Sequence, residues 1–132
     1  MTKLVTHERD GRRVPREGRT ITWIQKPQDG PLGPHHSSVC TVVFEPGGRA
    51  NPGHTHLKGE ETAYVISGHG RVRVGNEYFD LEPGSLVFFP QGVPHIMWNN
   101  GNEALHIVCF YAPKRESIEV LDDESFDHPE FL

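Results

Sequence analysis

Short runs of apolar and β-branched residues recur along the chain, and each run stops at a turn rich in glycine, proline or asparagine. Thr20–Ile24 alternates between apolar and polar positions as a short strand does, and Leu86–Phe89 is apolar throughout. About eight or nine short strands separated by regular turns predict an all-β fold, either a sandwich or a closed barrel. The predicted strands are Thr20–Ile24, Val39–Glu45, Thr62–Ile66, Arg71–Val74, Tyr78–Leu81, Leu86–Phe89, His95–Asn99 and Ala104–Tyr111.

Two turns stand out in this pattern. Gly75-Asn76-Glu77 separates two strand-like runs and predicts a hairpin. The stretch from Gln25 to Ser38 is rich in proline and glycine and therefore predicts a loop. His35 and His36 lie in this loop, and adjacent residues of an extended chain point apart. We therefore interpret them as loop histidines near the mouth of the barrel and not as one metal site.

Composition supports one turn-rich domain. The chain has 132 residues, 35% of them hydrophobic, with 14 glycines and 11 prolines. Neither a membrane-helix run nor the apolar core of a signal peptide is visible, which favours a cytoplasmic location. The net charge of −5 argues against nucleic acid as a partner. Cys40 and Cys109 lie in apolar runs, so we expect small buried residues kept reduced.

The two ends of the chain carry opposite charge. Residues 1–20 hold six Lys or Arg against three acids, and residues 114–132 hold seven acids against two bases. The ends either pair with each other, within a chain or across a dimer, or remain two solvated tails.

Candidate chemistry is concentrated between Gly48 and Asn99. His54 and His56 are two apart, so they point to the same face of a strand. Glu61 follows a polar turn and can open the next strand beside them, and His95 arrives on a separate strand. Three imidazoles and one carboxylate facing one interior suit a divalent transition metal.

These two stretches resemble the two signature motifs of the cupin superfamily. The first motif is filled by Gly48, His54, His56, Glu61 and Gly68, and the second by Gly84, Pro90, Gly92, His95 and Asn99. The resemblance covers about residues 38–112 and implies a small single-domain cupin, a jelly-roll barrel of two antiparallel sheets. We expect one domain over 1–132, with a charged N-terminal segment 1–19 and an acidic C-terminal tail 114–132 outside the barrel core.

Four protein ligands leave about two positions open on an octahedral manganese or iron ion, as a catalytic site requires. Nickel, cobalt or zinc are the alternatives. One carboxylate leaves the site net positive, which favours a chelating anionic substrate such as an enolate, a hydroxyketone or a carboxylate. A slip of one residue would place Glu60 inward in place of Glu61.

The alternation of side chains along a strand does not decide which other residues line the pocket. Met97 and Asn99 follow His95 inward, whereas Ile96 and Trp98 face the other way. On the last strand, the side chains that face inward are one of two alternating sets, either His106, Val108 and Phe110 or Leu105, Ile107, Cys109 and Tyr111. Arg71 and Arg73 share one face, which is either exposed to solvent or grips a substrate carboxylate. No catalytic residue is assigned.

Two functions remain open. One is a metal-dependent enzyme, either a dioxygenase or an isomerase or lyase acting on a small oxygen-rich substrate. The other is a non-catalytic module that binds or senses a sugar or carboxylate.

We also expect a homodimer, in which Thr20–Ile24 could pair with a partner's sheet. Five bulky residues near the ligand strands, not all of them inward, predict a small, mostly apolar cavity: Phe89, Met97, Trp98, Phe110 and Tyr111.

Overall fold

The computed structural model describes residues 4–25, 36–50, 53–56, 59–113 and 119–120. A single turn of 3-10 helix, η1 (Glu8–Asp10), precedes the first strand. The strands are β1 (Arg12–Arg16), β2 (Arg19–Gln25), β3 (Ser38–Phe44), β4 (His54–Thr55), β5 (Glu60–Ser67), β6 (Gly70–Val74), β7 (Glu77–Leu81), β8 (Leu86–Phe89), β9 (His95–Trp98), β10 (Leu105–Ala112) and β11 (Glu119–Val120).

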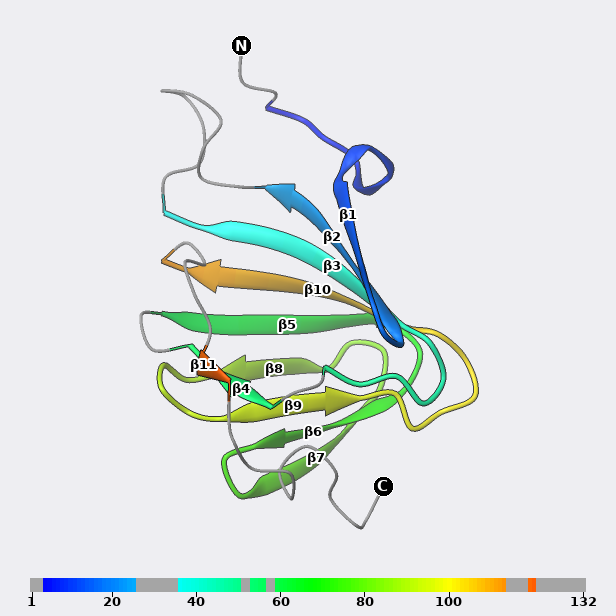
Figure 1. Cartoon of the computed structure of the whole chain (residues 1–132), viewed down its shortest axis with the longest axis vertical. Helices are drawn as coiled ribbons and strands as arrows, with labels where there is room; N and C mark the ends of the chain where they lie inside the picture. The colour runs from blue at the N-terminus through cyan, green and yellow to red at the C-terminus, as the bar shows by residue number, and fades with distance from the viewer. Residues whose placement is uncertain (1–3, 26–35, 51–52, 57–58, 114–118, 121–132) are drawn as a thin grey trace.

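The strands form two sheets in which every recorded pair is antiparallel (Figure 1). The six-stranded sheet has the order β1-β2-β3-β10-β5-β8, and the five-stranded sheet has the order β11-β4-β9-β6-β7. After β3 the chain passes from one sheet to the other at every connection except the one between β6 and β7, as in a jelly roll. The predicted all-β jelly roll of two antiparallel sheets is confirmed, and the hairpin predicted at Gly75 joins β6 to β7.

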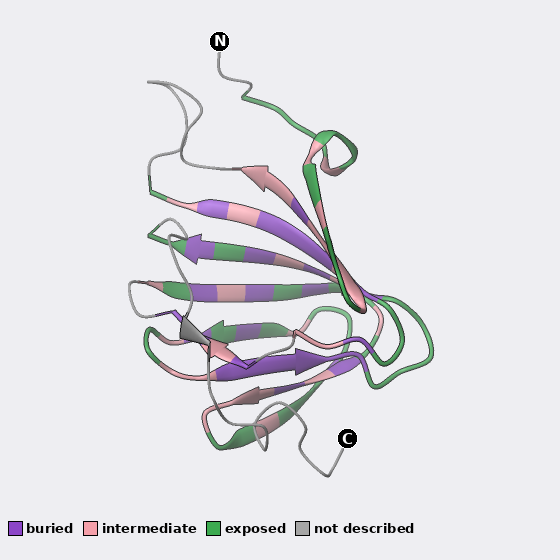
Figure 2. Ribbon diagram, in the orientation of Figure 1, coloured by how far each residue is buried: buried purple, intermediate pink, exposed green. Residues whose placement is uncertain are grey.

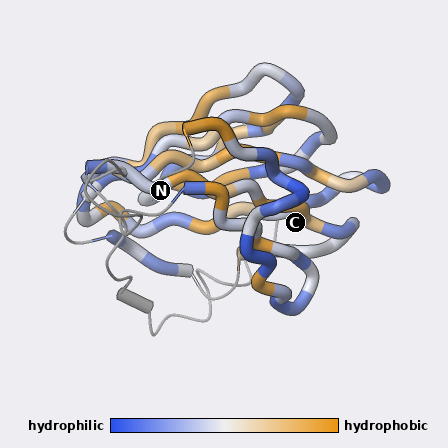
Figure 3. Tube along the Cα trace, turned by 90° about the horizontal axis from the view of Figure 1, so that it is seen from above, coloured by the Kyte–Doolittle hydropathy of each residue, from blue (hydrophilic) through white to orange (hydrophobic). Residues whose placement is uncertain are grey.

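Buried and exposed residues alternate along β5, β8 and β10 (Figure 2), and the core lies between the two sheets, on the buried side of these strands. In β10, Leu105, Ile107, Cys109 and Tyr111 are buried, while the residues between them are partly or fully exposed. Seen from above, apolar and polar positions alternate along the strands in the same way (Figure 3). Burial of one large aliphatic side chain stabilises the fold by about 1.5–3 kcal/mol, so this parity decides which face of β10 is inside.

The outer face of β10 holds the N-terminal segment. His106 points outward, and its Nε2 lies 3.0 Å from Oε1 of Glu8, which also accepts a hydrogen bond from the hydroxyl of Thr41. The hydrogen bond from Thr41 lowers the pKa of the Glu8 carboxyl below its ordinary value; partial burial opposes this shift, and His106 adds to it. The possibility that His106 faces the pocket is therefore wrong.

Strand β2 has no open edge. It pairs with β1 on one side and with β3 on the other, so Thr20–Ile24 cannot pair with the sheet of a second chain. The proposed edge pairing at this strand is wrong for that reason. Large apolar side chains are nevertheless exposed on the outer face of β10, β5 and β8, namely Phe110, Tyr64, Ile66, Leu86 and Phe88.

Several sequence expectations concern residues beyond those described. Of the acidic C-terminal tail 114–132, only the strand at 119–120 is described, so pairing of the charged ends lies outside the described residues. The same is true of His35, whereas His36 is exposed. Within the described residues, no helix combines the length and the apolar character needed to cross a membrane.

Candidate metal centre

Three strands bring the four predicted ligands together. His54 in β4 is the direct partner of His95 in β9, and His56 follows two residues after His54. Glu61 lies in β5, opposite Phe89 of β8 on one side and Tyr111 of β10 on the other. One ligand atom from each of the four residues lies within 4.8 Å of all the others. The cluster can therefore hold one ion.

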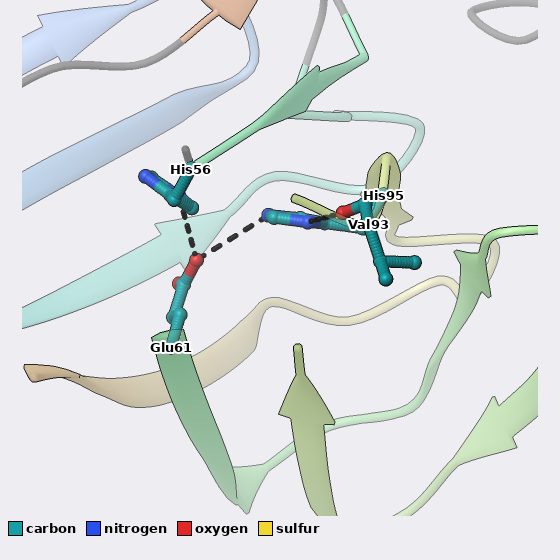
Figure 4. Close-up of polar contacts among 4 residues, drawn as sticks. All are labelled: His56, Glu61, Val93 and His95. Atoms are coloured by element: carbon teal, nitrogen blue, oxygen red, sulfur yellow. Dashed lines mark hydrogen bonds and ion pairs between the residues drawn. The ribbon is translucent and has the colours of Figure 1, made fainter. Parts of the chain in front are cut away.

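The contacts inside the cluster centre on one carboxylate oxygen (Figure 4). Oε2 of Glu61 lies 3.1 Å from Nε2 of His56 and 3.4 Å from Nε2 of His95. The imidazole rings of His54 and His95 are 4.6 Å apart between centroids. His56, Glu61 and His95 are buried, whereas His54 is only partly buried.

The ring of His95 is held in one tautomer. Its Nδ1 lies 3.1 Å from the carbonyl oxygen of Val93 (Figure 4). Since a carbonyl only accepts, Nδ1 carries a proton, and Nε2 is the ring nitrogen that faces the cluster. Nε2 is buried and, among the described residues, has no hydrogen-bond partner; its contact with Glu61 at 3.4 Å lacks hydrogen-bond geometry. A buried Nε2 facing a carboxylate oxygen requires a proton or a cation between them, and a divalent metal would fit that place.

Glu61 is suited to bind a cation. Burial by itself would raise the pKa of its carboxyl, but the contacts with His56 and His95 outweigh that effect and hold the pKa well below its ordinary value. The carboxylate therefore stays ionised inside the protein. Glu60, the alternative ligand, is exposed because the alternation of β5 turns it outward. The residues thus fit a divalent ion bound by Glu61 and three imidazoles.

A cavity of about 90 Å³ adjoins the cluster and includes His54, Glu61 and His95 in its wall. Phe89, Met97 and Tyr111 line it, as the strand pattern led us to expect for some of the bulky residues. Trp98 is buried against Ile96 and Tyr78 outside the main core, and Phe110 is exposed, so these two residues do not shape the cavity.

Asn99 also differs from its expected place in the pocket. It is buried, but its side chain donates to the carbonyl oxygens of Phe44 and Glu103 and accepts from the amide of Gly101. Asn99 therefore links the end of β9 to the neighbouring backbone through three hydrogen bonds. Its role is to support the strand that carries His95.

The arginines proposed to grip a substrate carboxylate face away from the cavity. Nε of Arg71 lies 3.4 Å from Oδ1 of Asp80, and the guanidinium of Arg73 lies 5.4 Å from the ring centroid of Tyr78. Both residues are absent from the cavity wall. The exposed-face alternative for Arg71 and Arg73 therefore holds.

Two thiols and one arginine are among the other residues that line the cavity. Cys40 and Cys109 are free, buried and directly opposite each other in β3 and β10. The hydrogen bond with Cys40, burial and the nearby Glu61 carboxylate raise the pKa of the Cys109 thiol, which therefore stays protonated. Arg19 also lines the cavity and was not considered from the sequence. Its shared parity with Ile21 was the signal that could have identified it.

Comparison with known proteins agrees with this architecture. The model of the Cupin domain family matches residues 40–111, more than half of the chain. The uncharacterized protein MJ1618 of Methanocaldococcus jannaschii is 34% identical over 71 residues, which cover 52% of this chain and 57% of that protein. Germin-like protein 9-3 of Oryza sativa subsp. japonica is 33% identical over 95 residues, covering 68% of this chain and 44% of that protein.

Among solved structures, the oxalate decarboxylase of Lactobacillus farciminis in its formate complex superposes with a TM-score of 0.76 at 25% identity. The match covers 87% of this chain and 35% of the decarboxylase chain. The chain thus spans only about half the length of the curated relatives it matches, and a smaller share of the decarboxylase.

Proposed function

Because this chain belongs to the cupin family, we propose that it is a small metal-dependent cupin enzyme acting on a small, chelating, oxygen-rich substrate. The reaction we propose is that of a dioxygenase or of an isomerase or lyase. One observation carries the proposal: four ligand atoms converge within 4.8 Å at the wall of a cavity, with a buried Nε2 of His95 that lacks a hydrogen-bond partner among the described residues.

The proposed ligands are His54, His56, Glu61 and His95, and the proposed ion is manganese or iron, with nickel, cobalt and zinc as alternatives. A bound divalent ion supplies Lewis acidity and open coordination positions for the substrate's oxygen atoms. Glu61 contributes the single negative charge of this ligand set. The site then keeps a net positive charge, which favours an anionic chelator.

The chain's own residues orient the site and limit access to it. The carbonyl of Val93 fixes the ring of His95, which keeps its Nε2 directed at the cluster. Phe89 and Met97 cover the inner side with apolar surface, so water is partly excluded from the ligand atoms. His54 is the one proposed ligand that is only partly buried, so it is the most accessible of the four from outside.

The alternative proposal, a non-catalytic module that binds or senses a small carboxylate or sugar, has its own support. Among the described residues that line the cavity, Glu61, His54 and His95 are the acid and imidazole groups, and all three are proposed ligands. A separate histidine or carboxylate positioned for proton transfer is therefore lacking within that described wall. Turnover, and not binding, discriminates the two functions.

Titration of manganese-loaded protein with small hydroxy, keto and dicarboxylic acids tests the proposal. We expect at least one of these acids to change the electron paramagnetic resonance spectrum of the bound manganese and to be consumed on longer incubation. Binding without consumption under aerobic and anaerobic conditions favours the sensing module. If a long oligosaccharide perturbs the manganese and none of the small acids does, the proposal of a small chelating substrate is wrong.

A homodimer is proposed separately. Exposed apolar side chains cluster on the outer face of β10, β5 and β8, where Phe110 and Phe88 flank Thr62, and Tyr64 adjoins Leu86. A two-fold axis would place the same face on both partners and remove these side chains from water.

A further inference from the structure

Arg19 brings a positive charge into the cavity from the side opposite the metal cluster. It opens β2 and pairs with Phe44 at the far end of β3. Arg19 and Ile21 are two residues apart in β2, so they point to the same face of the strand. Both line the cavity whose wall also includes Glu61 and His95. The side chain of Arg19 is partly buried. This arginine therefore faces the same interior space as the proposed ligands.

A short hydrogen bond holds the guanidinium in place. Nη1 of Arg19 donates to the carbonyl oxygen of Arg49 at 2.6 Å. Arg49 bridges to Trp98 of β9 and precedes Ala50, which lines the cavity. The bond thus connects the six-stranded sheet to the backbone beside the five-stranded sheet. An arginine fixed in this way is pre-organised, so less side-chain entropy is lost when it binds a ligand.

The wall of the cavity is polar at two ends and apolar between them. Within the described lining residues, Arg19 is the only arginine or lysine, and Glu61 is the only carboxylate. The residues between them contribute hydrocarbon or thiol surface and include Ile21, Val42, Met97, Ile107, Cys40 and Cys109. A ligand that fills such a space needs a chelating head, an apolar body and an anionic tail.

The strand register gives the scale of this ligand. Ser38 at one end of β3 and Glu61 both pair with Tyr111, while Phe44 at the other end pairs with Arg19. Because β3 is seven residues long, the backbone level of Glu61 and the backbone level of Arg19 are about 20 Å apart along the strand. The long side chain of Arg19 reaches back along part of that distance. With a volume of about 90 Å³, the cavity limits the ligand to a small molecule.

We propose that Arg19 binds the distal carboxylate of an elongated substrate whose other end chelates the metal. This inference rests on the proposed function, because it assigns the substrate class of the same site. A guanidinium presents parallel N–H groups that match the two oxygens of a carboxylate, and a partly buried setting strengthens that contact. The substrate class is thus an apolar-bodied dicarboxylate with an oxygen-rich chelating end.

The test measures the dissociation constants of paired ligands by isothermal titration calorimetry on manganese-loaded protein. The probes are alpha-ketoadipate and alpha-ketosuberate, each compared with the straight-chain keto monoacid of the same length, alpha-ketohexanoate and alpha-ketooctanoate. We expect one diacid to bind wild-type protein about tenfold or more tightly than its matched monoacid. Arg19→Gln should abolish this preference, because the diacid loses the contact that the monoacid never makes.

Arg16→Gln is the matched control. Arg16 is the partner of Arg19 across the same hairpin, but it is exposed and does not line the cavity. The control removes the same charge from nearly the same place, so it should keep the diacid preference. Arg19→Lys, which retains the charge without the parallel N–H groups, should keep a reduced preference and guards against a folding defect in Arg19→Gln.

The outcomes separate this inference from the function on which it rests. If diacids and monoacids perturb the metal equally in wild-type protein, or if Arg19→Gln keeps the preference, Arg19 does not bind the substrate and the chelating site still stands. If ligands of both kinds leave the manganese spectrum unchanged and release no heat, the proposed function fails together with the inference.

Discussion

Replacement of Asn99 by alanine should destabilise the fold without removing a metal ligand. Asn99 is 1% exposed. Its Nδ2 donates to the carbonyl oxygens of Phe44 at 3.0 Å and Glu103 at 2.7 Å, and its Oδ1 accepts from the amide of Gly101 at 3.0 Å. At about 1 kcal/mol of net stability per hydrogen bond, the loss is about 3 kcal/mol. Carbonyls left buried without water would raise it to about 5 kcal/mol.

Urea unfolding of metal-free protein at one fixed concentration measures this loss, because bound metal or a changing oligomeric state would shift the apparent stability. The control is Asn100→Ala, since Asn100 is the exposed neighbour in the same turn and should change stability by about 0.5 kcal/mol or less. A loss below about 1 kcal/mol in Asn99→Ala would show that these three hydrogen bonds do not fasten β9.

Three further predictions concern the site, the N-terminal segment and assembly. His56→Ala should lose bound metal because one of four ligands is removed, whereas His69→Ala, at an exposed turn, should retain it; equal metal content in both variants would refute the ligand assignment. The lowered pKa of Glu8 means that its contribution to stability is complete above the ordinary glutamate pKa and is lost as the pH falls through the lowered value. Unfolding measured against pH should therefore show a smaller acid loss in Glu8→Gln, and an unchanged acid profile would count against the contacts of Glu8 with Thr41 and His106. Light scattering at micromolar concentration should give a dimeric mass for wild-type protein and a monomeric mass for Phe88→Asp; a monomeric wild type contradicts the dimer.

The sequence was most informative where residue spacing and strand parity agree. The eight predicted strands correspond closely to strands of the structure, because short apolar runs between glycine and proline turns have few other folds available. The motif spacing predicts that Glu61, and not Glu60, faces inward. In the structure, the alternation of β5 buries Glu61 and exposes Glu60. The convergence of the histidines followed from the period-two rule once both motifs were placed in one barrel.

Parity alone could not decide which face of an amphipathic strand is inside. Both candidate faces of β10 contained apolar residues, and only its register between β3 and β5 shows that Leu105 faces the core and His106 faces Glu8. The same limit applied to Arg71, whose strand carries charge on one face without indicating where that face lies.

The N-terminal region was the least predictable part. Arg12–Arg16 contains four polar or proline positions in five, yet it pairs along its whole length with β2 as an outer strand. Edge strands bury little and therefore carry a weak hydrophobic pattern. Without this strand, the sequence pattern makes β2 an edge strand, and it does not show that Arg19 at the start of β2 faces the cavity.

Anomalous X-ray diffraction from crystals of protein purified without added metal tests the central claim most directly. Data collected on both sides of the manganese and iron absorption edges identify the element and locate it. We predict one anomalous peak per chain, enclosed by ligand atoms of His54, His56, Glu61 and His95. A transition-metal peak elsewhere in the chain, or no peak at this cluster even after soaking with manganese and iron, would contradict the account.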